Sequence, residues 1–177
     1  MNIANKFTML RVILIPFFLL VLYLFPENYA NYVAVVIFMI ASATDWLDGY
    51  LARSRNLVTN FGKFMDPLAD KLLVSAALIY LVEQGDIAAW IVIIIISREF
   101  VISGVRLVAA TSGKVIAASW WGKVKTFTTM IMIIVVLFQF QIRYIEYIEL
   151  ILIYASTILT VISALDYIVK NAGVFKE

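Results

Sequence analysis

The chain alternates between long apolar stretches and short polar connections. A helix needs about 17–25 mostly apolar residues to span a bilayer. Such a segment must be helical, because unpaired backbone groups are not tolerated against lipid. The stretches of suitable length are 8–25, 31–53, 61–83, 87–111, 122–140 and 145–168. The pattern therefore predicts an all-α integral membrane protein with six transmembrane helices.

The first residues are more polar than the apolar run that follows them. Asn2, Asn5, Lys6, Thr8 and Arg11 fall in this stretch, which is compatible with an interfacial helix at the start of the chain. No repeat or long linker indicates a second domain. We therefore predict that residues 1–177 form a single membrane domain.

Basic residues are distributed unevenly over the predicted connections. In a six-span arrangement most Lys and Arg fall on one side, and Arg143 alone falls clearly on the other. Positively charged connections stay on the cytoplasmic side. Both termini are thus expected in the cytoplasm, with the protein in the cell membrane.

The amino-acid composition excludes several kinds of catalytic and metal-binding site. The chain is 64% hydrophobic and 15% charged, and it contains no Cys and no His. Disulfides, thiolate nucleophiles, histidine bases and the usual zinc sites are thereby excluded. A metal would be held by oxygen ligands, as Mg²⁺ or Mn²⁺ prefers. No basic run is long enough to indicate binding of nucleic acid.

Two pairs of aspartates stand near one end of the second and third predicted helices. Asp45 and Asp48 are three residues apart, and Asp66 and Asp70 are four apart, so each pair shares a helix face. The short connection between the helices makes them antiparallel neighbours. Carboxylates so close together in apolar helices are costly unless cations neutralise them. The pattern predicts one or two divalent cations here.

Small and basic residues between the aspartates fit a phosphate-bearing ligand. Gly49 and Gly62 let a ligand approach the backbone, and Ala52 is small. Arg53 offers a planar fork of donors for phosphate oxygens. An alternative from another class is a cation or proton transporter that uses intramembrane aspartates. Transporters tend to place such groups at the midplane, often with internal repeats.

The residues from Asp45 to Asp70 spell D-x2-D-G-x2-A-R-x8-G-x3-D-x3-D, which resembles the signature of the CDP-alcohol phosphatidyltransferase family. The resemblance implies a homodimeric membrane enzyme with a dinuclear metal site. It implies that Asp70 is the catalytic base. The implied metal ligands are Asp45, Asp48, Asp66 and Asp70. The implied nucleotide contacts are Asp48, Gly49, Ala52, Arg53 and Gly62.

A second polar group lies in the fourth and fifth predicted helices. Charged groups in a membrane span usually face protein or a water-filled cavity. The cations Arg98, Arg106, Lys123 and Lys125 form a candidate site for the phosphate of an acceptor substrate. The alternative is an internal ion pair of Glu99 with Arg98 or Arg106 that only packs helices.

Four further segments resemble the branch of the family whose acceptor is glycerol 3-phosphate. They are Asn5-x2-Thr8-x2-Arg11, Phe64–Lys71, Ser97-Arg98-Glu99-x3-Ser103-Gly104-x-Arg106, and Trp121-Gly122-Lys123-x-Lys125-Thr126. The implied substrates are CDP-diacylglycerol and glycerol 3-phosphate. Serine, inositol phosphate and phosphatidylglycerol stay open as alternative acceptors, and the basic residues argue against serine.

Overall fold

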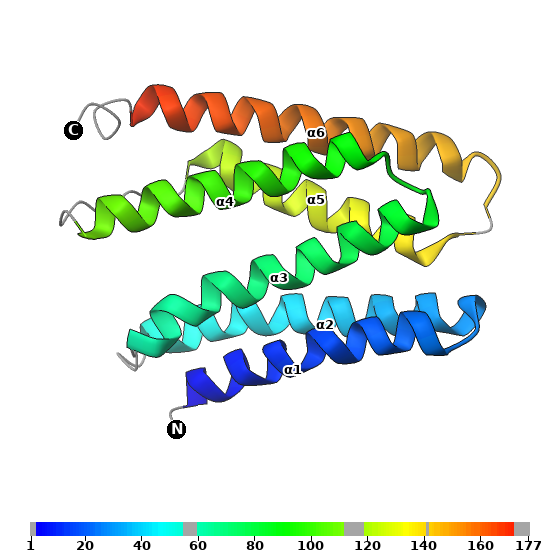
Figure 1. Ribbon diagram of the computed structural model, residues 1–177, viewed down its shortest axis with the longest axis horizontal. Helices are drawn as coiled ribbons and strands as arrows, with labels where there is room; N and C mark the ends of the chain where they lie inside the picture. Colours follow the sequence, from blue (N-terminus) through cyan, green and yellow to red (C-terminus); the bar gives the residue numbers. More distant parts are fainter. Residues whose placement is uncertain (1–2, 55–59, 112–118, 141, 172–177) are drawn as a thin grey trace. The chain divides into compact units, whose positions relative to one another are not determined.

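The structure is a computed structural model, and it describes residues 3–54, 60–111, 119–140 and 142–171. Inside the helices, the side chains of residues 3–8, 27–28, 45–54, 60–67, 70 and 110–111 lie outside this description. Over the described residues the chain forms six helices (Figure 1). They are α1 (Ile3–Leu24), α2 (Glu27–Ser54), α3 (Asn60–Gln84), α4 (Ala89–Thr111), α5 (Trp120–Phe138) and α6 (Ile145–Lys170).

The predicted positions of the helices are confirmed to within a few residues at each end. The polar residues at the start belong to α1, which runs without a break from Ile3 to Leu24. The predicted turn after α3 is built on Gly85, whose φ of 85° suits glycine. Gly85 N–H donates to the Val82 carbonyl and Asp86 N–H to the Leu81 carbonyl, which is a Schellman motif.

Helices α5 and α6 are each long and apolar enough to cross a membrane. Among the described residues, shorter apolar stretches cover Met9–Leu24 in α1 and Tyr29–Thr44 in α2. Helix α4 is apolar but carries Arg98, Glu99 and Arg106 within one stretch. Many large apolar side chains are exposed along the helices. An all-helical chain with this much exposed apolar surface is typical of a protein solvated by lipid.

The chain divides into two compact units, and the first comprises residues 1–80 and 137–139. Helices α1 and α2 pack along each other in this unit (Figure 1). The buried face of α2 carries Ala30, Ala34, Phe38 and Ala41, which recur at helical spacing. Small residues of this kind let two helix backbones approach closely.

Phe18 at the contact between α1 and α2 provides a test of this packing. Its side chain is fully buried, and its ring centroid lies 6.4 Å from that of Phe38. We expect Phe18→Ala to lower the free energy of unfolding by about 3–5 kcal/mol. The neighbouring Phe17 is 52% exposed, and Phe17→Ala serves as the matched control. Thermal unfolding in detergent compares the two variants, and equal losses would contradict the packing.

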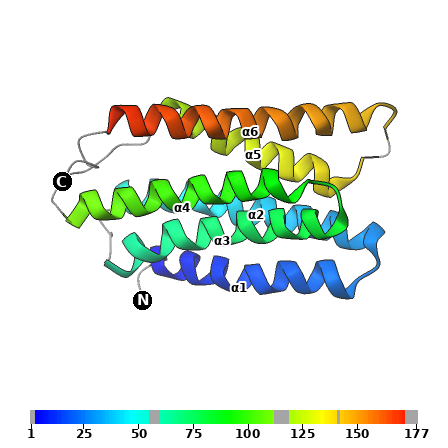
Figure 2. The same cartoon turned by 45° about the horizontal axis from the view of Figure 1, so that its top comes forward.

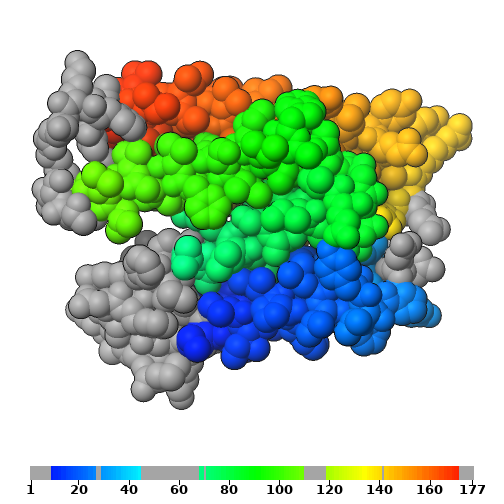
Figure 3. Space-filling model, in the orientation of Figure 1, coloured from blue at the N-terminus to red at the C-terminus, as the bar shows by residue number. Residues whose placement is uncertain are grey.

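The second unit comprises residues 81–136 and 140–177. Helices α4 and α6 lie along each other in the ribbon and space-filling views (Figure 2, Figure 3). Helix α5 contacts α6 through a hydrogen bond of 2.7 Å between the hydroxyls of Thr129 and Ser156. The face that α6 buries is partly polar and contains Ile153, Ser156, Thr157, Thr160, Ser163 and Tyr167. Small polar residues at helix contacts are common in membrane proteins.

Candidate active site

The four predicted metal ligands fall in the first unit of the chain. Asp45 and Asp48 belong to α2, and Asp66 and Asp70 to α3. Both helices are continuous through these positions, so the spacing that places each pair on one helix face is retained. Their side chains lie outside the described residues. Convergence of the carboxylates thus stays a prediction.

For the predicted nucleotide contacts, too, the structure describes the backbone and not the side chains. Gly49, Ala52 and Arg53 lie in the last turns of α2, and Gly62 lies in the first turn of α3. Their side-chain surroundings are outside the description as well. Within the described part of the chain, no group of three or more acidic, Cys or His side chains is placed to hold a metal ion. The side chains of the four predicted aspartate ligands are not among these described groups.

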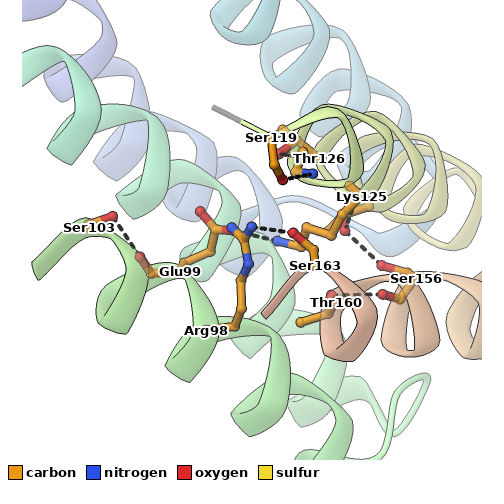
Figure 4. A network of polar contacts seen from close by, with 11 residues as sticks. Arg98, Glu99, Ser103, Ser119, Lys125, Thr126, Ser156, Thr160 and Ser163 are labelled. Carbon is orange, nitrogen blue, oxygen red and sulfur yellow. Dashed lines mark hydrogen bonds and ion pairs between the residues drawn. The ribbon is translucent and has the colours of Figure 1, made fainter. Parts of the chain in front are cut away.

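The described polar site is a cluster in the second unit that joins α4, α5 and α6 (Figure 4). One carboxylate oxygen of Glu99, Oε1, accepts from Arg98 Nη1 at 3.0 Å and from Lys125 Nζ at 2.6 Å. The other terminal nitrogen of Arg98, Nη2, donates to the hydroxyl of Ser163 on α6. We call Arg98, Glu99, Lys125 and Ser163 the Arg98 cluster.

The Arg98 cluster combines charged side chains with burial between apolar helices. Its side chains are largely buried: Lys125 is 2% exposed, Arg98 10% and Glu99 19%. Two cations share one carboxylate oxygen. Among the described residues the Nε atom of Arg98 is buried without a hydrogen-bond partner. A bound anion would satisfy this donor.

The start of α5 lies directly against Arg98. Ser119 caps this helix, because its hydroxyl accepts from the Gly122 N–H at 3.1 Å. A Cβ atom on Gly122 would lie 3.4 Å from Arg98 Nη2 and 3.7 Å from the Ser163 hydroxyl. Glycine at this position therefore allows the first turn of α5 to pack against the guanidinium group.

The other two predicted phosphate ligands lie outside the hydrogen bonds of the Arg98 cluster. Arg106, two turns further along α4, has an exposed side chain. Lys123 is exposed near the start of α5. Of the four predicted cations, the structure therefore joins Arg98 and Lys125 through a shared carboxylate.

Sequence reasoning missed the contribution of α6. Ser163 accepts a hydrogen bond from Arg98 and lies on a helix that carries no part of the predicted site. A signal for this face exists in the sequence, because Ser156, Thr160 and Ser163 recur at helical spacing in an apolar segment. Such a stripe predicts a helix contact, but it does not reveal which residue lies opposite.

Arg98 also borders an apolar groove of about 320 Å³ between α4 and α6. Aliphatic side chains from both helices form most of its wall, and Ser97 and Thr160 add hydroxyl groups. The guanidinium group of Arg98 reaches past this wall to Glu99 and Ser163. Its side chain thus connects an apolar surface to the charged cluster.

One family match covers the aspartate signature and the predicted phosphate ligands Arg98, Arg106, Lys123 and Lys125. The model of the CDP-alcohol phosphatidyltransferases matches residues 1–162. The chain belongs to this family. The match covers most of both compact units, and it confirms the resemblance read from the aspartate signature.

Curated relatives cover nearly the whole chain. A protein of Bacillus subtilis (strain 168) is 45% identical over 96% of this chain and 95% of its own length. One of Haemophilus influenzae is 45% identical over 97% and 94%, and one of Escherichia coli (strain K12) is 42% identical over 94% and 93%. Each is named CDP-diacylglycerol–glycerol-3-phosphate 3-phosphatidyltransferase. Family membership favours an enzyme over the transporter alternative.

Proposed function

We propose that this CDP-alcohol phosphatidyltransferase transfers the phosphatidyl group of CDP-diacylglycerol to glycerol 3-phosphate. The products are phosphatidylglycerophosphate and CMP. The observation that carries the proposal is near-full-length similarity, at 42–45% identity, to enzymes named for this reaction. The two buried cations of the Arg98 cluster support an acceptor that carries its own phosphate.

Helical spacing places each pair of aspartates in line with buried residues of its own helix. The buried residues Phe38 and Ala41 of α2 are followed at the same spacing by positions 45 and 48. In α3, the buried residues Leu73 and Ala77 continue the spacing of positions 66 and 70. In each helix the pair of acids thus extends a stripe that is buried further along.

The donor set suits a divalent metal. Asp45, Asp48, Asp66 and Asp70 provide only hard carboxylate oxygens, which fit Mg²⁺ or Mn²⁺. The chain lacks the His and Cys that softer metals select. We propose that these residues hold two such ions. When bound, they supply positive charge that stabilises the pyrophosphate and the departing phosphate.

The remaining steps belong to side chains of the protein. Asp70 accepts the proton from the free primary hydroxyl of glycerol 3-phosphate. The hydroxyl oxygen bonds to the phosphorus that bears the diacylglycerol, and the bond from that phosphorus to the oxygen of CMP breaks. Arg53 binds phosphate oxygens of the nucleotide. Such transfers depend mainly on positioning and charge stabilisation.

The Arg98 cluster is proposed to bind the phosphate of the acceptor. Within the described part of the chain, the buried Nε of Arg98 has no acceptor, and Lys125 adds a second cation at 2.6 Å from the shared carboxylate. Arg106 and Lys123 are proposed to contribute from more exposed positions. Charge-assisted hydrogen bonds to a phosphate are stronger than those between neutral groups.

We further propose that all six helices cross the cell membrane, with both termini and the active site on the cytoplasmic side. The excess of Lys and Arg in connections on that side supports this orientation. A homodimer is proposed from the family resemblance.

A panel of acceptors tests the proposed reaction. The purified protein receives CDP-diacylglycerol, Mg²⁺ or Mn²⁺, and one of glycerol 3-phosphate, serine, inositol phosphate or phosphatidylglycerol, and CMP release is measured. We expect kcat/KM for glycerol 3-phosphate to exceed that for each other acceptor by about 100-fold, because a built polar site discriminates strongly against ligands that leave it unpaired. A higher kcat/KM for another acceptor would replace glycerol 3-phosphate in the proposal.

A further inference from the structure

Glu99 is the one acid of the Arg98 cluster, and the proposed reaction gives it no direct role. A carboxylate repels phosphate, so its presence between two phosphate-binding cations needs a physical reason. Its side chain is only 19% exposed, and a single oxygen contacts both Arg98 and Lys125. We propose that Glu99 is a positioning residue that fixes both cations for the acceptor phosphate, with Ser163 fixing the other side of Arg98. This inference rests on the proposed function.

Lys125 depends on Glu99 because of its burial. At 2% exposure, its ammonium group has little access to water, and a buried charge without a counterion is costly. The bond of 2.6 Å to Glu99 offsets that cost. Without the carboxylate, Lys125 loses this ion pair, and its ammonium group is no longer fixed for the proposed phosphate site.

Arg98 is held from two sides. Nη1 donates to Glu99 on its own helix, and Nη2 donates to Ser163 on α6. These bonds fix the plane of the guanidinium group, which a long flexible side chain would otherwise sample freely. A fixed plane preserves the geometry for binding phosphate through parallel hydrogen bonds.

Kinetics of Glu99→Gln in the full-length protein test the inference. We expect KM for glycerol 3-phosphate to rise by about tenfold, because both charged contacts are lost. KM for CDP-diacylglycerol should stay within about twofold, since a local change affects only the groups it contacts. For Ser163→Ala, which retains both ion pairs, the expected rise in KM for glycerol 3-phosphate is about threefold. Should Glu99→Gln fail to fold, Glu99→Asp takes its place, because it retains the negative charge but draws the carboxylate back from Arg98 and Lys125.

Two variants control for loss of a charge or a hydroxyl elsewhere in the second unit. Glu146→Gln removes an exposed acid from the first turn of α6. Thr128→Ala removes a hydroxyl that donates to the Val124 carbonyl within α5. Both should leave KM for glycerol 3-phosphate within about twofold of the wild-type value.

The outcomes separate the inference from the proposed function. An unchanged KM for glycerol 3-phosphate in folded Glu99→Gln would overturn the positioning role. So would a fall in kcat with both KM values unchanged, because that indicates a general structural defect. Wild-type protein that releases no CMP with glycerol 3-phosphate would instead overturn the proposed function.

Discussion

Replacing Asp70 by asparagine is expected to lower kcat by about 1,000-fold, because the change removes both a general base and an anionic metal ligand. Asparagine is nearly the same size as aspartate, so the helical position in α3 is retained while the charge is lost. The measurement is CMP release from CDP-diacylglycerol with saturating glycerol 3-phosphate.

Asp86 provides the matched control for this substitution. It is an exposed aspartate in the turn between α3 and α4, outside the predicted metal site. Asp86→Asn should retain kcat within about twofold of the wild-type value, as expected for an exposed site away from the chemistry. If Asp70→Asn kept more than about a tenth of the wild-type rate, the general-base role would be excluded, since such a role contributes at least 100-fold.

Removing divalent cations should abolish the transfer altogether. The predicted ligands are four carboxylates, which bind cations reversibly, so EDTA should stop CMP release. Mg²⁺ or Mn²⁺ should restore it, whereas Ca²⁺ should restore less than about a tenth, because Ca²⁺ prefers longer bonds and more ligands.

A binding measurement makes the metal prediction independent of turnover. Titration of the metal-free protein with Mn²⁺, followed by electron paramagnetic resonance, should show ions bound by the wild type. Asp66→Asn should weaken that binding by at least about tenfold, because one anionic ligand is lost. Full activity in EDTA, or equal Mn²⁺ affinity in Asp66→Asn, would contradict the predicted metal site.

Helix positions were predictable because hydrophobicity along the chain is a local property. The apolar segment predicted at 145–168 corresponds to α6 at Ile145–Lys170, and the segment at 61–83 corresponds to α3 at Asn60–Gln84. Gly85 marked the turn because only glycine adopts its positive φ without strain. The predicted helical structure of the polar start is confirmed by α1, which begins at Ile3, and its interfacial position stays a prediction.

The aspartate signature identified the family because its spacing is read directly along two helices. The acceptor site was less predictable. The sequence named Arg98 and Lys125 with Arg106 and Lys123, but it did not indicate which of them share a counterion. Two pairings for Glu99 were considered, with Arg98 or with Arg106, and the structure pairs it with Arg98 and Lys125.

The sequence by itself determined that this protein is built of apolar helices, belongs to the phosphatidyltransferases and carries a signature of closely spaced acids. Those properties follow from residue order and helical repeat. Only the tertiary structure decided that Ser163, which is 65 residues from Arg98 in the chain, holds its guanidinium group. It also decided that Lys125 shares the carboxylate of Glu99. Such contacts depend on how α4, α5 and α6 pack, and that packing sums many weak side-chain contacts that no local pattern records.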